Sequence, residues 1–150
     1  MTIESPYKST ILASAPEVIV DLDSADELSI RSLLLGIVHR TAGEYIAARA
    51  FLVDAHARQP DLTISTWVGG IALFELAVLE LKEAEVSVVS LPSREAKAVW
   101  TKALEVASGE LDRALALAMG NNSDLSSRLD TRIAMLKDEI AMKREIVGGL

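Results

Sequence analysis

Apolar residues recur every three or four positions along most of this chain, which is the spacing of a helix that buries one face. Each stretch with this pattern is bounded by glycine, proline or a capping residue. Alanine and leucine are abundant while glycine and proline are few, so the composition also favours helix over sheet. The pattern predicts an all-α protein with five main helices, over residues 24–41, 44–59, 65–88, 94–119 and 124–146.

The first two predicted helices form a hairpin. Gly43 supplies a permissive backbone at the break between them, and Pro60 ends the second because proline cannot donate the helical hydrogen bond. Gly36 lies inside the first helix, where glycine costs about 1 kcal/mol relative to alanine. We therefore predict that the second helix crosses closely at Gly36. Ala48 and Ala55, two turns apart on one face of the second helix, allow that approach.

The spacing within this hairpin resembles the tetratricopeptide repeat of about 34 residues. The matching positions are Leu35-Gly36, His39, Gly43, Tyr45, Ala48, Leu52, Ala55 and Pro60. The chain departs from the repeat where Ser32, His39 and Leu52 stand in place of larger or aromatic residues. The resemblance implies helical hairpins stacked into a right-handed α-α superhelix, here two hairpins and a C-terminal capping helix.

The sequence predicts a second, degenerate hairpin over residues 65–119. Ala107, Leu111, Ala114 and Ala118 repeat the alternation of alanine and a large apolar residue found in the first hairpin. Ser93 and Glu95 are a plausible capping start for the second helix of this pair, and Ser108-Gly109 predicts a weak point within it.

The last predicted helix, within residues 124–147, carries one apolar stripe of Leu125, Leu129, Ile133, Leu136 and Ile140, and charged residues on its other faces. A helix that is apolar inward and polar outward is what the end of a helical-repeat array requires. A coiled-coil seam for a partner helix is the competing interpretation.

The sequence predicts an N-terminal arm or lid over residues 1–23, followed by a helical domain over residues 24–147. The stretch from Leu28 to Val38 leaves almost no polar face on the first helix, so both of its sides need cover. Either the arm covers the outer side, or a partner or a second copy does.

Length and charge narrow the class of protein. A chain of 150 residues fits one domain. It has no cysteine for a disulfide framework or a thiolate zinc site, and this absence suits an intracellular, cytoplasmic protein. A net charge of −7 argues against a nucleic-acid surface. The most apolar stretch, residues 67–81, is too short for a bilayer and contains Glu75 and Glu80, so we expect a buried helix and no transmembrane segment.

The sequence offers little for catalysis. His39 and His56 lie on different predicted helices, and His39 occupies a packing position of the repeat. Glu44, Asp54 or Glu75 could join a histidine, but their spacing requires no such site, and no phosphate loop or nucleophile elbow is present. We expect no enzyme, with no catalytic, metal-binding or cofactor-binding residue. Trp67 and Trp100 read as packing residues, and Asn121-Asn122-Ser123 as a turn.

A wider resemblance covers about residues 25–145. Leu33 to Gly36, then Ala72 to Leu76, then Ser127 to Ile133 follow the order and spacing of the closing repeats of the inclusion body clearance proteins of the mitochondrial outer membrane and their animal tetratricopeptide-repeat relatives. Members of that family are several times longer than this chain. The resemblance implies a helical-repeat domain, with residence at the mitochondrial outer membrane as a weaker expectation and no catalytic residue to transfer.

The resemblance to tetratricopeptide arrays implies a groove for a partner peptide along the first helix. The corresponding positions are Ile30, Leu33, Ile37, Arg40 and Thr41, a mainly aliphatic set that favours an apolar helix or peptide. Residues 7–20 of the same chain could cover Ile30, Leu33 and Ile37 instead. Protein binding, or self-association as a homodimer, is the expected function. The alternative is a hydrophobic small molecule or lipid held between the third and fourth helices.

Overall fold

The computed structural model describes residues 24–120 and 124–149. The described part contains α3 (Ala25–Thr41), α4 (Tyr45–Ala57), α5 (Val68–Ser87), α6 (Ser93–Met119) and α7 (Asp124–Gly148), with short 3-10 turns η2 (Gln59–Asp61) and η3 (Val88–Ser90) and no strand. The predicted all-α class is confirmed. The predictions for the arm at residues 1–23 and for the turn at residues 121–123 lie outside the described residues.

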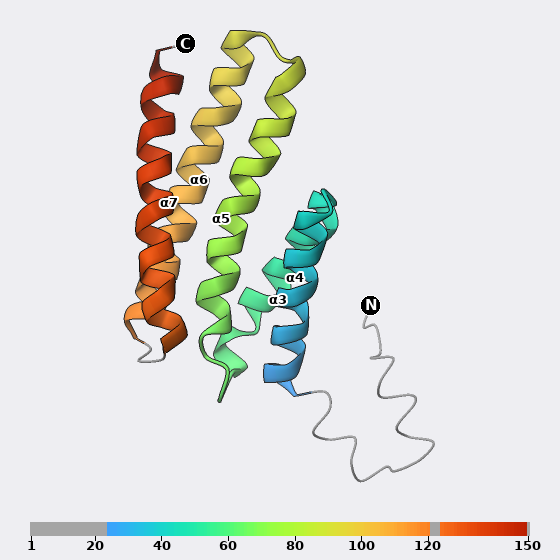
Figure 1. Cartoon of the computed structure of the whole chain (residues 1–150). Helices are drawn as coiled ribbons and strands as arrows, with labels where there is room; N and C mark the ends of the chain where they lie inside the picture. Colours follow the sequence, from blue (N-terminus) through green and yellow to red (C-terminus); the bar gives the residue numbers. More distant parts are fainter. Residues whose placement is uncertain (1–23, 121–123, 150) are drawn as a thin grey trace.

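Successive helices pack against one another in two layers. Figure 1 shows α3, α5 and α7 in the front layer, with α4 behind α3 and α6 behind α5 and α7. Within the front layer α5 contacts both α3 and α7. The short α3–α4 pair lies beside the first half of α5, and the second half of α5 packs mainly against α6 and α7 (Figure 1). The side chain of Arg49 on α4 reaches Glu80 and Glu83 in that second half.

Gly36 is the point at which α3 and α4 touch most closely. A Cβ atom at Gly36 would lie 2.6 Å from both Cγ and Cδ2 of Leu52, whose side chain is fully buried. Ala48 and Ala55 on either side of Leu52 are also fully buried. The predicted close crossing is therefore confirmed. Gly43, with φ of 81°, forms the turn between the two helices in the left-handed region that glycine tolerates.

Helix ends differ from the prediction where a proline is involved. Ser24 caps α3, since its Oγ accepts from the Glu27 amide at 3.2 Å. However, α4 ends at Ala57, and Pro60 lies inside the 3-10 turn that follows. Pro92 precedes α6, and no side chain caps this helix, so the predicted cap by Ser93 is wrong.

The helix α6 is continuous through the expected weak point at Ser108-Gly109. The helix runs through Gly109 for 27 residues, and a Cβ at Gly109 would meet nothing within 4 Å. Flanking residues Ala107 and Leu111 are fully buried, so tertiary packing outweighs the low helix propensity of glycine.

The core is centred on α5. Nearly all of its first half is buried, as the apolar run predicts. The charged Glu75 is buried within that half, at 3% exposure. None of the described helices is both long enough and apolar enough to cross a membrane.

Asp26 in the first turn of α3 holds the loop that leads into α5. Its carboxylate accepts the amide N–H groups of Ser65 at 2.6 Å, Ile64 at 3.0 Å and Thr63 at 3.3 Å, and the Thr63 hydroxyl at 3.1 Å. The hydrogen bond from Ser65, with those from Ile64 and Thr63, lowers the pKa of Asp26 to about 2. The start of α3 is thereby joined to the loop before α5.

We expect Asp26→Asn to lower the thermal midpoint, because an amide nitrogen cannot accept the bonds that one carboxylate oxygen accepts. The pKa of Asp26 is depressed by folding, so its contribution to stability is present above its ordinary value of 3.8 and is lost as the pH falls towards about 2. Thermal unfolding followed by circular dichroism from pH 5 to pH 2 measures this loss. The variant should show a flatter dependence on pH than the wild type. Asp61→Asn, on the exposed side of η2, is the matched control.

Candidate functional site

The residues predicted to line a groove on α3 fall in different environments. Leu33 is buried in the core at 3% exposure, and the Arg40 guanidinium is bound to Glu75. Ile30 and Ile37 are partly buried and pack against the core. Thr41 is exposed and donates its hydroxyl to the Ile37 carbonyl at 2.9 Å. Leu33 and Arg40 are thus occupied within the protein, and partner binding by the other three remains a prediction.

Glu75 links the three helices of the front layer. Its Oε2 accepts from Arg40 Nε at 3.2 Å and lies 3.0 Å from a second Arg40 nitrogen, while its Oε1 lies 3.7 Å from an Arg132 nitrogen. Arg132 also lies over the Phe74 ring, 4.4 Å from the centroid. Because Arg40 comes from α3 and Arg132 from α7, a single buried carboxylate holds both neighbouring helices to α5.

Beyond this ion pair, α5 and α7 separate and leave a cleft. Figure 1 shows the two helices diverging towards their C-terminal ends, with α6 behind the gap. The cleft has a volume of about 380 Å³. Apolar side chains from all three helices form its floor: Val78, Leu81, Trp100, Leu104, Leu136 and Ile140. Two charged side chains stand on each rim: Lys82 and Glu85 on α5, Glu139 and Lys143 on α7.

Below the cleft, α5 and α7 approach each other closely at a glycine. A Cβ at Gly70 would lie 3.2 Å from Leu129 Cδ2, a contact tighter than side chains normally make. The helices therefore meet at the level of Gly70 and Leu129. Further along α5, Val78, Leu81 and Lys82 are partly or fully exposed at the cleft.

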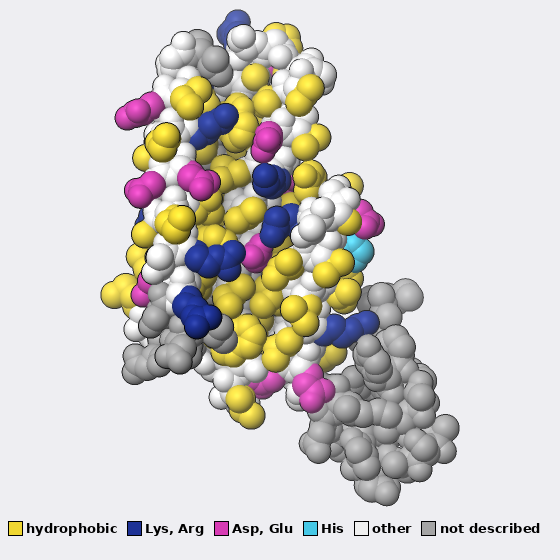
Figure 2. Space-filling view, viewed as in Figure 1, with side chains coloured by type: hydrophobic (Ala, Val, Ile, Leu, Met, Phe, Trp, Pro, Cys, Tyr) yellow, Lys and Arg dark blue, Asp and Glu magenta, His cyan; other side chains and the backbone are white. Residues whose placement is uncertain are grey.

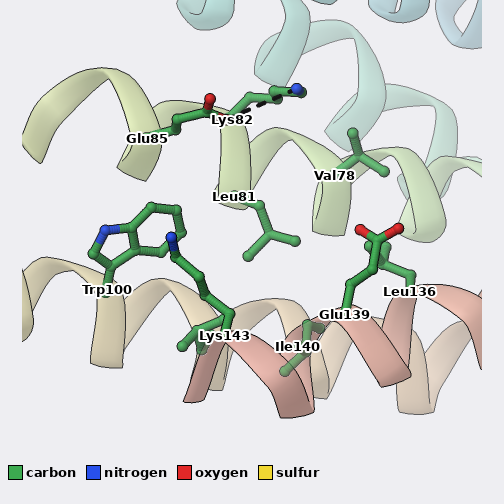
Figure 3. Close-up of a pocket in the computed structure, with 10 residues that line it drawn as sticks. Val78, Leu81, Lys82, Glu85, Trp100, Leu136, Glu139, Ile140 and Lys143 are labelled. Atoms are coloured by element: carbon green, nitrogen blue, oxygen red, sulfur yellow. Dashed lines mark ion pairs between the residues drawn. The ribbon is translucent and has the colours of Figure 1, made fainter. Parts of the chain in front are cut away.

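The rim charges are placed over the apolar floor. Figure 3 shows Lys82 and Glu85 along one wall, with Lys143 and Glu139 across from them and Leu81 and Ile140 between. The Lys143 ammonium lies 4.2 Å from the centroid of the Trp100 ring, a cation–π arrangement that holds it at the edge of the cleft. Lys82 and Glu85 are 3.8 Å apart on the same helix.

The cleft can hold an elongated, amphipathic ligand. Figure 2 shows Lys and Arg side chains gathered over the boundary between α5 and α7, above an apolar surface. Glu139 and Lys143 make no ion pair with any other residue in the described part of the chain. An apolar ligand with charged groups at its edges would bury the floor and pair with these side chains.

A second charged cluster lies on the opposite side of α5. Arg49 on α4 donates to Glu80 at 2.5 Å and to Glu83, both on α5. Glu110 on α6 is buried nearby, at 5% exposure, and its Oε1 has no hydrogen-bond partner. Burial, together with the negative charge of Glu80, raises the pKa of Glu110 to about 7. Glu110 is therefore a buried carboxyl that binds a proton near neutral pH.

We expect Glu110→Gln to stabilise the protein at pH 8 and to have little effect at pH 5. Folding raises the pKa of Glu110 from 4.5 to about 7, so the stability that this group contributes when protonated is lost as the pH rises through that interval. The change in the free energy of unfolding that Glu110→Gln causes should differ by about 2 kcal/mol between pH 8 and pH 5. Urea unfolding at the two pH values measures it, with Glu105→Gln on the exposed face of α6 as the control. An equal effect at both pH values would contradict the shifted pKa.

Among the described residues, neither His39 nor His56 belongs to a group of side chains that could hold a metal ion. The His39 ring stacks on Phe51, with centroids 5.3 Å apart and planes 11° apart, which confirms its packing role. Its Nδ1 lies 3.5 Å from Glu44 Oε1 without a hydrogen bond. Asp54 binds Ser32 and Arg58. In residues 24–120 and 128–149, no three His, Asp or Glu side chains come together in a way that could hold a metal ion.

The sequence placed most cleft residues in the correct helices, but its alternative function put a hydrophobic ligand between the third and fourth helices, whereas the cleft is lined by α5, α6 and α7. Leu136 and Ile140 belong to the predicted buried stripe of the last helix, and Lys143 to its polar face. The pairing of Lys143 with Trp100 joins residues far apart in the sequence, so no local pattern could reveal it. One feature of the sequence could have indicated the cleft: apolar and charged residues recur together in both helices that form its walls.

Comparisons with known proteins identify no relative of this chain. The chain matches no family model, and searches of curated proteins and of solved structures likewise return no match.

Proposed function

We propose that this protein is a non-catalytic scaffold of tetratricopeptide type that binds a helix or peptide of another protein. The repeat-like spacing from Leu35 to Pro60 and the close crossing at Gly36 support the tetratricopeptide assignment. The placement of α3, α5 and α7 in one layer supports it too, because the first helices of successive hairpins form one face of such arrays.

The observation that carries the proposal is the cleft between α5 and α7. Its floor is apolar, its rims are charged, and one side is open along the helices. Peptide-binding surfaces use apolar pockets for affinity and surrounding charges for specificity. In this proposal the partner occupies the cleft, and a contact with the exposed Thr41 and the partly exposed Ile37 of α3 is a further part of the proposal.

Selection of a random peptide library displayed on phage against the full chain tests this function. We expect enriched peptides to bind the wild type and to bind Leu81→Glu at least tenfold more weakly, because the carboxylate would lie in the apolar floor. Val53→Glu, on the exposed side of α4, is the matched control and should bind normally. Binders that are indifferent to Leu81→Glu would place the interaction elsewhere and contradict the proposal.

A second candidate function is the binding of a hydrophobic small molecule or lipid. The volume of about 380 Å³ falls within the range of about 300–1,000 Å³ common for small-molecule sites, and the cleft lies between α5, α6 and α7. Native mass spectrometry of the purified chain would detect a co-purified ligand. A ligand that Leu81→Glu removes would favour this candidate over peptide binding.

Self-association is a further form of protein binding that the first helix permits. Leu34 and Val38 on α3 are 58% and 61% exposed among the described residues. Light scattering on the intact chain and on a chain lacking residues 1–20 distinguishes the alternatives. Association only after truncation would mean that the arm covers α3, whereas dimers of both chains would make α3 an interface.

A further inference from the structure

The charges on the two rims of the cleft alternate in sign. α5 and α7 run in the same direction, so Lys82 and Glu139 lie in the first part of the cleft and Glu85 and Lys143 follow further along. Each rim therefore carries one cation and one anion, and each part of the cleft has opposite charges on its two sides. The four charges sum to zero on a protein with a net charge of −7.

The spacing of these charges is that of a helix. Lys82 and Glu85 are three residues apart, and Glu139 and Lys143 are four apart. At a rise of about 1.5 Å per residue these intervals are about 4.5 and 6 Å, close to the helical pitch of about 5.4 Å. Side chains on one face of an extended strand repeat at about 6.8 Å. A partner helix with flanking charges three or four residues apart can therefore align them with the charges on both walls.

The balance of charges argues against a simple anionic amphiphile. A fatty carboxylate would gain from Lys143 or Lys82, but Glu139 and Glu85 line the same rims. Repulsion from these carboxylates would offset much of that gain. A ligand with charges of both signs can pair with all four side chains.

We infer that the cleft between α5 and α7 binds one amphipathic helix of a partner protein, with an apolar seam flanked by both acidic and basic residues. The inference rests on the proposed protein-binding function and specifies the partner. Apolar residues at i, i+3 or i+4, and i+7 of the partner cover the floor between Val78 and Ile140. Its flanking carboxylates pair with Lys82 and Lys143, and its flanking cations pair with Glu85 and Glu139.

Two displayed libraries test the inference on the full chain. One consists of stapled helical peptides of about 15 residues with a fixed leucine seam and flanks randomised among Glu, Lys, Gln and Ala. The other has the same apolar content in proline-containing extended peptides. We expect the helical library to be enriched, with both Glu and Lys selected at the flanks. Affinity should fall about tenfold on Lys143→Glu and on Lys82→Glu.

Compensation provides the decisive readout. A peptide in which the selected glutamate opposite Lys143 is changed to lysine should bind Lys143→Glu better than it binds the wild type. Lys102→Glu is the matched control, because Lys102 lines a separate hollow beside Arg49 and leaves the cleft unchanged. Circular dichroism verifies that each variant is folded.

The outcomes separate the inference from the proposed function. Enrichment of extended peptides that bind Lys143→Glu more weakly than the wild type would rule out a helical partner but would still support the binding of a protein or peptide. Helical binders with flanks of a single sign, or binding of dodecanoate that displaces the selected peptide, would also overturn the inference. If neither library yields a peptide sensitive to the rim variants or to Leu81→Glu, the proposed function fails as well.

Discussion

Replacing Gly36 with alanine is expected to lower the free energy of unfolding by about 2 kcal/mol, although alanine is the better helix former. The added Cβ would lie 2.6 Å from Leu52, which is fully buried between Ala48 and Ala55 and has little room to move. Either α3 and α4 separate or Leu52 leaves its preferred rotamer. Urea unfolding of the purified variant measures the loss.

Gly109→Ala is the matched control for this substitution. It makes the same chemical change inside a helix, at a site where the new Cβ meets nothing within 4 Å. We expect it to stabilise the protein by about 0.5–1 kcal/mol. In a Leu52→Ala background, Gly36→Ala should lose most of its effect because the opposing side chain is gone. A Gly36→Ala variant as stable as Gly109→Ala would show that α3 and α4 are not in close contact.

Removal of Arg40 is expected to have an equally large effect, for an electrostatic reason. Arg40→Met leaves the Glu75 carboxylate, whose side chain is 4% exposed, with Arg132 at 3.7 Å as its one cationic partner among the described residues. Breaking a buried ion pair from one side generally costs about 3–5 kcal/mol, and we expect about 3 kcal/mol here because Arg132 remains. Chemical denaturation at neutral pH measures this effect.

The double variant Arg40→Met, Glu75→Met separates the two contributions. With both charges absent, apolar packing should recover most of the stability lost in Arg40→Met. Arg58→Met is the control, since the Arg58–Asp54 pair is half-exposed, with side chains 34% and 41% accessible, and its loss should cost less than about 1 kcal/mol. A double variant as unstable as Arg40→Met would contradict the view that the unpaired carboxylate causes the loss.

The sequence predicted the helices well because their signal is local. Apolar spacing located all five main helices, and Gly36 indicated a close crossing because glycine inside a helix needs a compensating contact. Errors arose at Pro60 and Ser93, where a 3-10 turn and a preceding proline determine the helix end. At Gly109 tertiary packing overrides the local preference.

The candidate site could not be predicted from local sequence patterns because it depends on contacts between residues that are far apart in the sequence. Glu75 could be recognised as an unusual charge in an apolar helix, but its partner Arg40 lies 35 residues away. The cleft exists because α5 and α7 meet near Gly70 and diverge beyond it, and no short pattern encodes that angle. Whether Ile30, Ile37 and Thr41 contact a partner remains a prediction.

The position of Glu75 in the chain bears on the order in which the protein acquires structure during synthesis. Most packing joins helices that are neighbours in sequence, so α3 and α4 can associate as soon as they leave the ribosome. The Glu75 carboxylate emerges after Arg40 and well before Arg132. Until α7 is synthesised, α5 carries an incompletely neutralised charge beside an uncovered apolar surface. The packing of α7 on α5 and α6, and the second ion pair of Glu75, therefore form only after α7 has been synthesised.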